Sequence, residues 1–463
     1  MSLMKKLFQR FMNHGPSIFN LKDTFGAARA AMLGAGLVSA IISTLTAGVF
    51  YTGFLLAYDI NIVNAGIIAF IPNISAVLCI FSAKIFGRMR RRRIPLAVMR
   101  TFYYIFSILG ITIVPVFVED NSARVTAFII LTFVSHMLNA ISSPAYTSWH
   151  IRYIPDEVRA RYLSVNQIVV NIAACGSALI CSLVADALAG SPAEKTVIIT
   201  LRYVAFALAI VETICLSLPK EYDYEEPPRQ KLSNIVTVCL KNKKFAITML
   251  VVLFYYFTTG LTASNLNYYL LNTAKVSYTY ISVVNICYLA FLGLFTGYWR
   301  KKLSRYAWFT VFWVGTILIA VTYIPYAFVT GSNYLWLMTI VRFVQHFVGV
   351  GHNITIANLA YINLPETDRT NYISCYTIIV NAASLLGQLA GTAYVAVIGD
   401  TAIHLLGISL GSVQQLLLIT AVLMALTSLF AVKNIRKLSP ESDQYKLVPG
   451  GAIPRVRKFG KMR

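Results

Sequence analysis

Twelve long apolar stretches run along this chain, and short polar connections separate them. Each stretch reaches or exceeds about 20 residues, the length at which an α-helix crosses the hydrocarbon core of a bilayer. The pattern predicts membrane spans at 29–54, 62–86, 96–118, 123–148, 164–187, 197–218, 245–271, 277–299, 305–329, 333–361, 373–397 and 412–433. We therefore expect an all-α integral membrane protein with about 12 transmembrane helices.

The polar segments divide the chain into parts. Residues 3–12 place apolar side chains on one helical face and basic ones on the other, which is typical of a short helix on a membrane surface. Residues 220–244 contain prolines and alternating charges and predict a linker. The expected parts are a cytoplasmic amphipathic segment at 1–28, a six-helix bundle at 29–218, a cytoplasmic linker at 219–244, a second six-helix bundle at 245–433 and a basic cytoplasmic tail at 434–463.

The second half of the chain repeats the first with an offset of 210 positions, as from Gly87 to Gly297. Two unrelated hydrophobic sequences would share Leu and Ile by chance, but not polar and proline residues in one register. The matched pairs are Arg90 with Arg300, His136 with His346, Pro155 with Pro365, Arg159 with Arg369, and Asn171 with Asn381. Because an even number of spans separates the copies, both repeats have the same orientation in the membrane.

This parallel 6+6 repeat resembles the major facilitator superfamily over nearly the whole chain. Basic loops at 87–93 and 297–302 follow the second and eighth spans, where that family carries its glycine-rich gating loop. Pro-acidic-x-x-Arg-like segments at 155–159 and 365–369 follow the fourth and tenth spans. The resemblance implies a secondary transporter that alternates access by moving its two halves around a site near the membrane midplane.

The repeated basic residues at the cytoplasmic ends of the spans are expected to act as gating residues. They are Arg90, Arg159, Arg300 and Arg369. The family's loop usually carries an aspartate before its basic cluster, whereas this chain has none there. The predicted acidic partners are Asp156, Glu157, Glu366 and Asp368.

Composition and charge agree with a chain solvated by lipid. Hydrophobic residues make up 57% of the chain and charged residues only 13%, and the net charge is +22. Of the 40 Lys and Arg, only Arg124, Lys195, Arg202 and Lys275 fall at or near the odd-to-even connections. This asymmetry predicts cytoplasmic termini and contact with the anionic inner leaflet of a cell membrane, with a bacterial inner membrane expected, rather than nucleic-acid binding.

Two polar stripes at equivalent positions of the repeats are the main candidate for the substrate site. Arg342, His346, Gly349 and Asn353 share one face of the tenth span, and Thr132, His136, Asn139 and Ser143 share one face of the fourth. The resemblance implies that these two spans line the central cavity, so Arg342, His346, Asn353, His136 and Asn139 are expected to contact substrate. The alternative is that Arg342 pairs with a carbonyl or a neighbouring Glu and that the histidines join helices.

Further polar residues repeat on other spans. Asn171 and Asn381 lie on the fifth and eleventh spans, and either substrate contact or interhelical hydrogen bonding fits them. Tyr256 in the seventh span, with its repeat partner Thr46 in the first, is a further candidate for substrate contact. The small residues Ala383, Gly387 and Gly391 repeat at four-residue intervals and predict a close helix–helix seam.

Glu212 is a carboxylate well inside the predicted sixth span. Removal from water favours the neutral acid, so Glu212 is a candidate for coupling transport to a proton. The alternative is a structural role in which Glu212 pairs with a cation. The resemblance favours the structural role, since it places the sixth span outside the central cavity.

The sequence contains no P-loop, no metal-binding cluster and no catalytic motif, so we expect no enzyme activity, no cofactor and no metal. The predicted function is secondary active or facilitative transport, including symport with an ion such as H⁺, by a functional monomer. Arg342 and the histidines favour a small polar or anionic organic solute such as a sugar, sugar acid or organic acid. The alternatives are multidrug or metabolite efflux, lipid transport, and a non-transporting membrane receptor.

Overall fold

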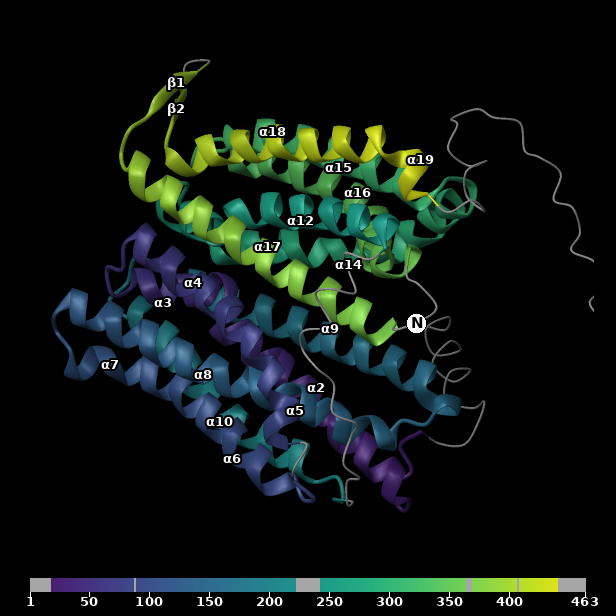
Figure 1. The fold of residues 1–463 in the computed structure, drawn as a ribbon. Helices are drawn as coiled ribbons and strands as arrows, with labels where there is room; N and C mark the ends of the chain where they lie inside the picture. The colour runs from purple at the N-terminus through teal and green to yellow at the C-terminus, as the bar shows by residue number, and fades with distance from the viewer. Residues whose placement is uncertain (1–17, 87–88, 222–241, 364–368, 406–407, 440–463) are drawn as a thin grey trace, which may run out of the picture. The chain divides into compact units, whose positions relative to one another are not determined.

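A computed structural model describes residues 18–86, 89–221, 242–363, 369–405 and 408–439 (Figure 1). The chain forms two compact units. The N-terminal unit comprises residues 1–229 with 277–282, and the C-terminal unit comprises residues 230–276 with 283–463. Residues 1–17 of the predicted amphipathic segment, most of the linker and most of the tail lie outside the described residues.

The N-terminal unit is helical throughout its described part. Its elements are α2 (Thr24–Thr46), α3 (Gly48–Leu56), α4 (Ile62–Ala76), η1 (Val77–Ile80), α5 (Phe81–Phe86), α6 (Arg93–Tyr104), the π-helix η2 (Ile105–Gly110), α7 (Ile111–Phe117), α8 (Asn121–His150), η3 (Ile151–Tyr153), α9 (Asp156–Ala187) and α10 (Glu194–Ser217). The first span breaks between α2 and α3, where Gly48 has φ +56°, a conformation that glycine adopts without strain.

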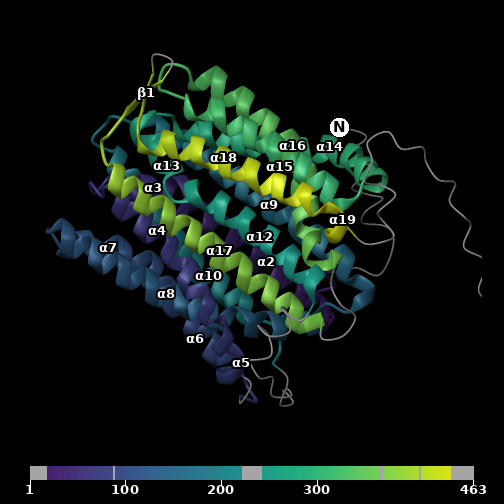
Figure 2. The same cartoon turned by 45° about the horizontal axis from the view of Figure 1, so that its top comes forward.

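The C-terminal unit contains α12 (Lys243–Ala263), α13 (Leu266–Tyr268), the π-helix η4 (Tyr269–Thr273), most of α14 (Tyr278–Arg305), α15 (Trp308–Ala327), α16 (Tyr334–Ile362), α17 (Arg369–Ile398), α18 (Ser412–Lys433) and α19 (Ile435–Leu438). The first residues of α14, up to Ser282, belong to the N-terminal unit. A short antiparallel hairpin of β1 (Ile403–Leu405) and β2 (Ile408–Leu410) joins α17 to α18, with His404 opposite Ser409. Figure 2 shows α12, α15, α17 and α18 gathered in this unit.

The helices of the two units pair in the same pattern. In the N-terminal unit α2 packs on α9 and α10, and α6 packs on α8 and α10. In the C-terminal unit α12 packs on α17 and α18, and α15 packs on α16 and α18. These are the pairings of spans one, three, four, five and six in each copy, so the internal sequence repeat is also a repeat of packing.

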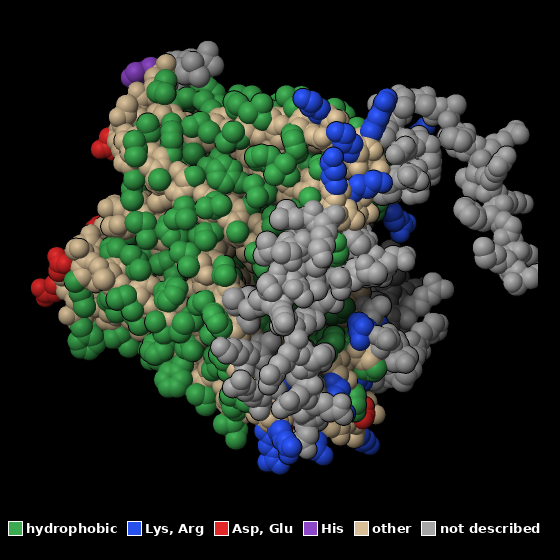
Figure 3. Space-filling model, viewed as in Figure 1, with side chains coloured by type: hydrophobic (Ala, Val, Ile, Leu, Met, Phe, Trp, Pro, Cys, Tyr) green, Lys and Arg blue, Asp and Glu red, His purple; other side chains and the backbone are tan. Residues whose placement is uncertain are grey.

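Eleven helices of the described chain are long and apolar enough to cross a membrane. The predicted all-α membrane fold is therefore confirmed. The tenth predicted span, α16, is not among the eleven although it has 29 residues, because polar side chains interrupt its apolar sequence. On the face shown in Figure 3, apolar side chains cover the middle of each unit, and Lys and Arg side chains gather toward one end of it.

The small-residue row of α17 forms the predicted seam with α12. A Cβ atom at Gly387 would lie 2.1 Å from the carbonyl oxygen of Phe257, and one at Gly391 would lie 1.9 Å from that of Leu261. Both distances are far below van der Waals contact, so only glycine allows the two backbones to approach so closely.

Candidate functional site

Arg342 lies on α16 with its charged group held by neutral amides. Its Nη2 donates a hydrogen bond to Asn285 Oδ1 on α14 at 2.6 Å, and its Nη1 donates to Gln345 Oε1 at 3.2 Å. Gln345 in turn donates from Nε2 to Thr322 Oγ1 at 2.9 Å. The Nε of Arg342 is buried without a hydrogen-bond partner among the described residues.

No carboxylate of the described residues forms an ion pair with Arg342. The hydroxyl of Tyr323 on α15 is near enough to interact with its charge and lies close to Thr262 of α12. The side chain of Arg342 is half-buried, and Asn285 is exposed. The guanidinium is therefore fixed in place by amides while its positive charge stays uncompensated.

Two other members of the α16 stripe, His346 and Asn353, join it to α14. The Nε2 of His346 lies 2.8 Å from the backbone oxygen of Val284, which requires the proton to be on Nε2. Asn353 donates from Nδ2 to the hydroxyl of Tyr288 at 2.9 Å. His346 is buried, and its ring packs against Tyr288 with 5.5 Å between centroids. The stripe predicted for the tenth span therefore faces α14 within the C-terminal unit.

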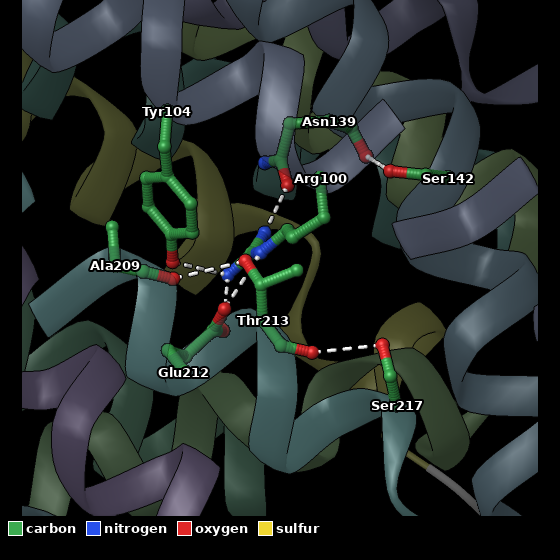
Figure 4. Close-up of polar contacts among 8 residues, drawn as sticks. All are labelled: Arg100, Tyr104, Asn139, Ser142, Ala209, Glu212, Thr213 and Ser217. Atoms are coloured by element: carbon green, nitrogen blue, oxygen red, sulfur yellow. Dashed lines mark hydrogen bonds and ion pairs between the residues drawn. The ribbon is translucent and has the colours of Figure 1, made fainter. Parts of the chain in front are cut away.

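The N-terminal unit holds a different polar cluster, which Figure 4 shows in close-up. Arg100 of α6 donates from Nη2 to Glu212 Oε1 of α10 at 2.6 Å and from Nε to Oε2 at 3.2 Å. The remaining nitrogen, Nη1, donates to Asn139 Oδ1 of α8 at 2.7 Å, and Nη2 also donates to the hydroxyl of Tyr104 at 2.8 Å. The structure therefore brings the predicted residues Asn139 and Glu212 together through a cation.

Arg100 was not among the predicted site residues. It lies inside the predicted span 96–118, near the end that carries the other basic residues, and was counted with them as part of the positive-inside pattern. The signal that could have found it is the combination of this position with the solitary acid Glu212, since a buried carboxylate needs a cationic partner.

Of the remaining predicted contact residues, His136 reaches the Arg100 cluster through Tyr103, whose ring centroid is 5.1 Å from Arg100 Cζ. Within the described residues the others form no hydrogen bond to either cluster. His136 lies edge-on to Tyr103, with 5.7 Å between ring centroids, and Tyr256 lies edge-on to Tyr255 at 5.4 Å. Thr46 donates to the carbonyl of Ile42 in its own helix, and Asn171 accepts from Gln167 one turn earlier on α9. Asn381 is half-buried on α17. Thr46 and Asn171 thus bond within their own helices.

Comparison with known proteins agrees with this architecture. The model of the Major Facilitator Superfamily matches residues 248–462. The fold is similar to a variant of the nucleoside transporter NupG, with a TM-score of 0.64 and 14% identity over 88% of this chain and 99% of that one. The chain has the major facilitator fold. The resemblance found in the sequence is therefore confirmed.

Two further solved structures share the major facilitator fold with this chain. A bacterial homologue of the human lysosomal transporter Spinster, in an inward-facing conformation, aligns with a TM-score of 0.63 and 15% identity over 90% of this chain and 98% of that one. The xylose transporter XylE from E. coli, in an inward-open conformation, aligns with a TM-score of 0.59 and 14% identity over 89% and 96%. The search of curated proteins gave no match.

The four arginines predicted to act in gating lie in different surroundings. Arg90 and Arg300 are exposed. Arg159 donates from Nε and Nη2 to the carbonyl oxygen of Ile154, at 3.4 and 3.3 Å. Arg369 begins α17, but its side chain and those of the predicted acidic partners lie outside the described residues.

An acidic residue that was not predicted accepts hydrogen bonds from the first basic loop. The carboxylate of Glu221, just after α10, accepts from the backbone N–H of Arg92 and from that of Arg93, the latter at 2.8 Å. These N–H groups begin α6, so Glu221 caps the positive end of that helix. The backbone oxygen of Lys220 also accepts from the Trp149 indole at 3.4 Å. The segment that leads into the linker is therefore bound to the ends of α6 and α8.

Proposed function

We propose that this protein is a secondary transporter that moves a small polar or anionic organic solute across the membrane by alternating access. The observation that carries the proposal is the uncompensated positive charge of Arg342. The proposed symporter acts as a monomer, in a cell membrane, with both termini in the cytoplasm. Import of a sugar, sugar acid or organic acid is proposed ahead of efflux of a neutral or anionic compound.

The contrast between two arginines supports an anion-binding role. A charged side chain at membrane depth is costly unless protein or water stabilises it. Arg100 is neutralised by Glu212 at 2.6 Å, whereas among the described residues Arg342 has only the neutral oxygens of Asn285 and Gln345 as hydrogen-bond partners. A carboxylate or a set of hydroxyls from a solute would supply the acceptors that Arg342 lacks.

The amides around Arg342 support recognition by shape as well as by charge. Asn285 and Gln345 hold two nitrogens of the guanidinium, which fixes the plane of the fork. A fixed fork favours two-point contact with a planar carboxylate. Asn353 of the same helix and Tyr288 of α14 offer amide and hydroxyl groups that suit a polyhydroxylated solute.

The solutes of proteins with a similar fold support the proposed class of solute. They include transporters of a nucleoside and of xylose, both of which carry several hydroxyl groups. Because their identity to this chain is low, they support a polar solute and do not select one. The Arg342 cluster is the reason to place acidic solutes first.

For a symporter, the proposal assigns the coupling proton to Glu212. Its carboxylate is bonded at both oxygens to Arg100, so it can take up a proton only after this pair separates. The contact with Arg100 equally supports the structural alternative. Uptake by proteoliposomes under an imposed proton gradient separates the two, since a Glu212→Gln symporter would exchange solute but no longer accumulate it.

A solute library tests the proposed substrate class. Purified protein is heated with matched panels of anionic, neutral polyhydroxylated and cationic solutes, because a ligand that binds only the folded state raises the melting temperature by mass action. Stabilisation is expected from anionic members first and polyhydroxylated members second. Stabilisation by cationic or purely apolar compounds alone would contradict the proposed class.

A further inference from the structure

A second arginine is sealed inside the helices of the N-terminal unit. Arg202 of α10 is 1% exposed. Its Nε donates to Thr112 Oγ1 at 2.8 Å, and its Nη2 donates to the backbone oxygen of Ser107, in the π-helix η2, at 3.0 Å. The ring of Phe54 covers the guanidinium, with 4.4 Å between its centroid and Cζ. No organic solute can reach this charge without the helices separating.

The positive charge of Arg202 has no counter-charge among the described residues. No carboxylate there forms an ion pair with it, and its hydrogen-bond acceptors are one hydroxyl and the backbone carbonyls of Ser107 and Ile108. Neutral acceptors satisfy individual N–H groups, but they leave a full positive charge in a medium of low dielectric constant. A buried ion without a partner of opposite charge strongly destabilises a protein.

Three hydrogen-bond donors around this charge are also unpartnered. Arg202 Nη1, the hydroxyl of Tyr51 on α3 and the hydroxyl of Thr132 on α8 are all buried and make no hydrogen bond to the described residues. The Tyr51 hydroxyl lies close to Thr132 and interacts with the charge of Arg202, and its ring centroid is 5.4 Å from Cζ. Buried polar groups are normally satisfied, so each of these three donors calls for an acceptor.

We propose that Arg202, Tyr51 and Thr132 bind a small monovalent inorganic anion of the halide class. One negative charge balances Arg202, and a spherical acceptor accepts hydrogen bonds from donors on three different helices. Water would satisfy the donors but would leave the charge uncompensated. The site is separate from the Arg342 cluster, which lies in the other unit and is partly exposed. The anion would stabilise the N-terminal unit and would not be transported.

Chloride is the probe for this site. Purified protein is heated in sodium chloride and in sodium gluconate at equal ionic strength, so that general screening is the same in both. The melting temperature of the wild type is expected to rise with chloride and to saturate, as binding to one site requires. Equal melting temperatures in the two salts at every concentration would overturn the proposal.

Conservative variants test whether chloride binds at Arg202 and Tyr51. Tyr51→Phe removes one donor without changing shape and should weaken chloride binding about tenfold, the usual value of a hydrogen bond to a charged group. Tyr203→Phe removes a hydroxyl from the adjacent residue of α10, whose side chain is 43% exposed, and should leave chloride binding unchanged. Arg202→Gln should abolish the chloride dependence. Wild-type chloride affinity in Tyr51→Phe would overturn the proposal even if Arg202→Gln fails to fold.

Discussion

Arg100 and Glu212 form a two-point ion pair inside the N-terminal unit, with Nη2 and Oε1 at 2.6 Å and Nε and Oε2 at 3.2 Å. The side chain of Glu212 is 2% exposed, and that of Arg100 is 15% exposed. At the repeat position of Arg100 the C-terminal unit has Thr310, and its last long helix, α18, contains no acidic residue. The pair is therefore a feature of one unit alone and adds cross-links among α6, α8 and α10 that the repeat does not share.

Removal of one partner from this pair should destabilise the protein more than removal of both. Glu212→Gln leaves Arg100 buried without a counter-charge, a change that costs about 3–5 kcal/mol in other proteins. The double variant Arg100→Met with Glu212→Leu should lose less stability than either single variant, because it leaves no unpaired buried charge. A double-mutant cycle measures the unfolding free energies of the wild type, the two single variants and the double variant in detergent. Additive losses would show that the two charges do not depend on each other.

Gly387→Ala should disrupt the contact between α12 and α17. The new methyl group would lie 2.1 Å from the backbone oxygen of Phe257, so the helices must move apart. A loss of several degrees in melting temperature and a lower yield of folded protein are expected. Gly293→Ala is the matched control, since a Cβ atom there meets nothing within 4 Å and alanine favours helix. Equal melting temperatures for the two variants would refute the proposed seam.

Glu221→Ala should weaken the start of α6. The carboxylate caps two backbone N–H groups there, and loss of a helix cap typically costs about 1 kcal/mol. Hydrogen exchange at Arg92 and Arg93 should accelerate, and that elsewhere in the unit should not. Glu119→Ala removes the same charge from an exposed position and should leave this exchange unchanged. Unchanged exchange in Glu221→Ala would mean that the contact is absent in the membrane.

Cysteine labelling should establish the orientation of the chain. The charge pattern predicts that Asn121 and Asn333 lie outside and that Arg92, Lys231 and Lys446 lie inside. Single cysteines at these positions, in a background without native cysteines, are treated with an impermeant thiol reagent on intact cells. Positions 121 and 333 should react, and the others should react only after permeabilisation. Labelling of position 231 from outside would reverse the topology.

Apolar length and the internal repeat were enough to predict the helical spans and the fold, because membrane insertion depends on local sequence. The same reasoning could not give the partner of Glu212, since Arg100 is 112 residues away and only tertiary packing joins them. The break at Gly48 and the two π-helices were also not predicted, because each is a local change within an unbroken apolar stretch.

For the polar stripe of α16, helical periodicity predicted which residues lie on one side but not which groups they contact. Spacing along the helix correctly placed Arg342, His346 and Asn353 on one side of it, where all three meet α14. It could not predict that His346 would be held by the carbonyl of Val284 or that Arg342 would be held by amides. These partners lie on other turns and helices, and they determine which residue of the stripe has a charge without a counter-charge.

Binding and stability measured on one preparation of Arg342 variants test the central claim most directly. A solute that stabilises the wild type in the library screen is titrated against wild type, Arg342→Ala, Arg342→Lys and Arg305→Ala. Arg305 is an exposed arginine at the end of α14, so its variant controls for the loss of one positive charge. Arg342→Ala should stay folded and lose binding. Arg342→Lys should keep only part of the wild-type affinity, because an ammonium group supplies the charge but not two-point contact. Arg305→Ala should bind the solute as the wild type does. Wild-type affinity in a stable Arg342→Ala protein would contradict the assignment of Arg342 to the solute site.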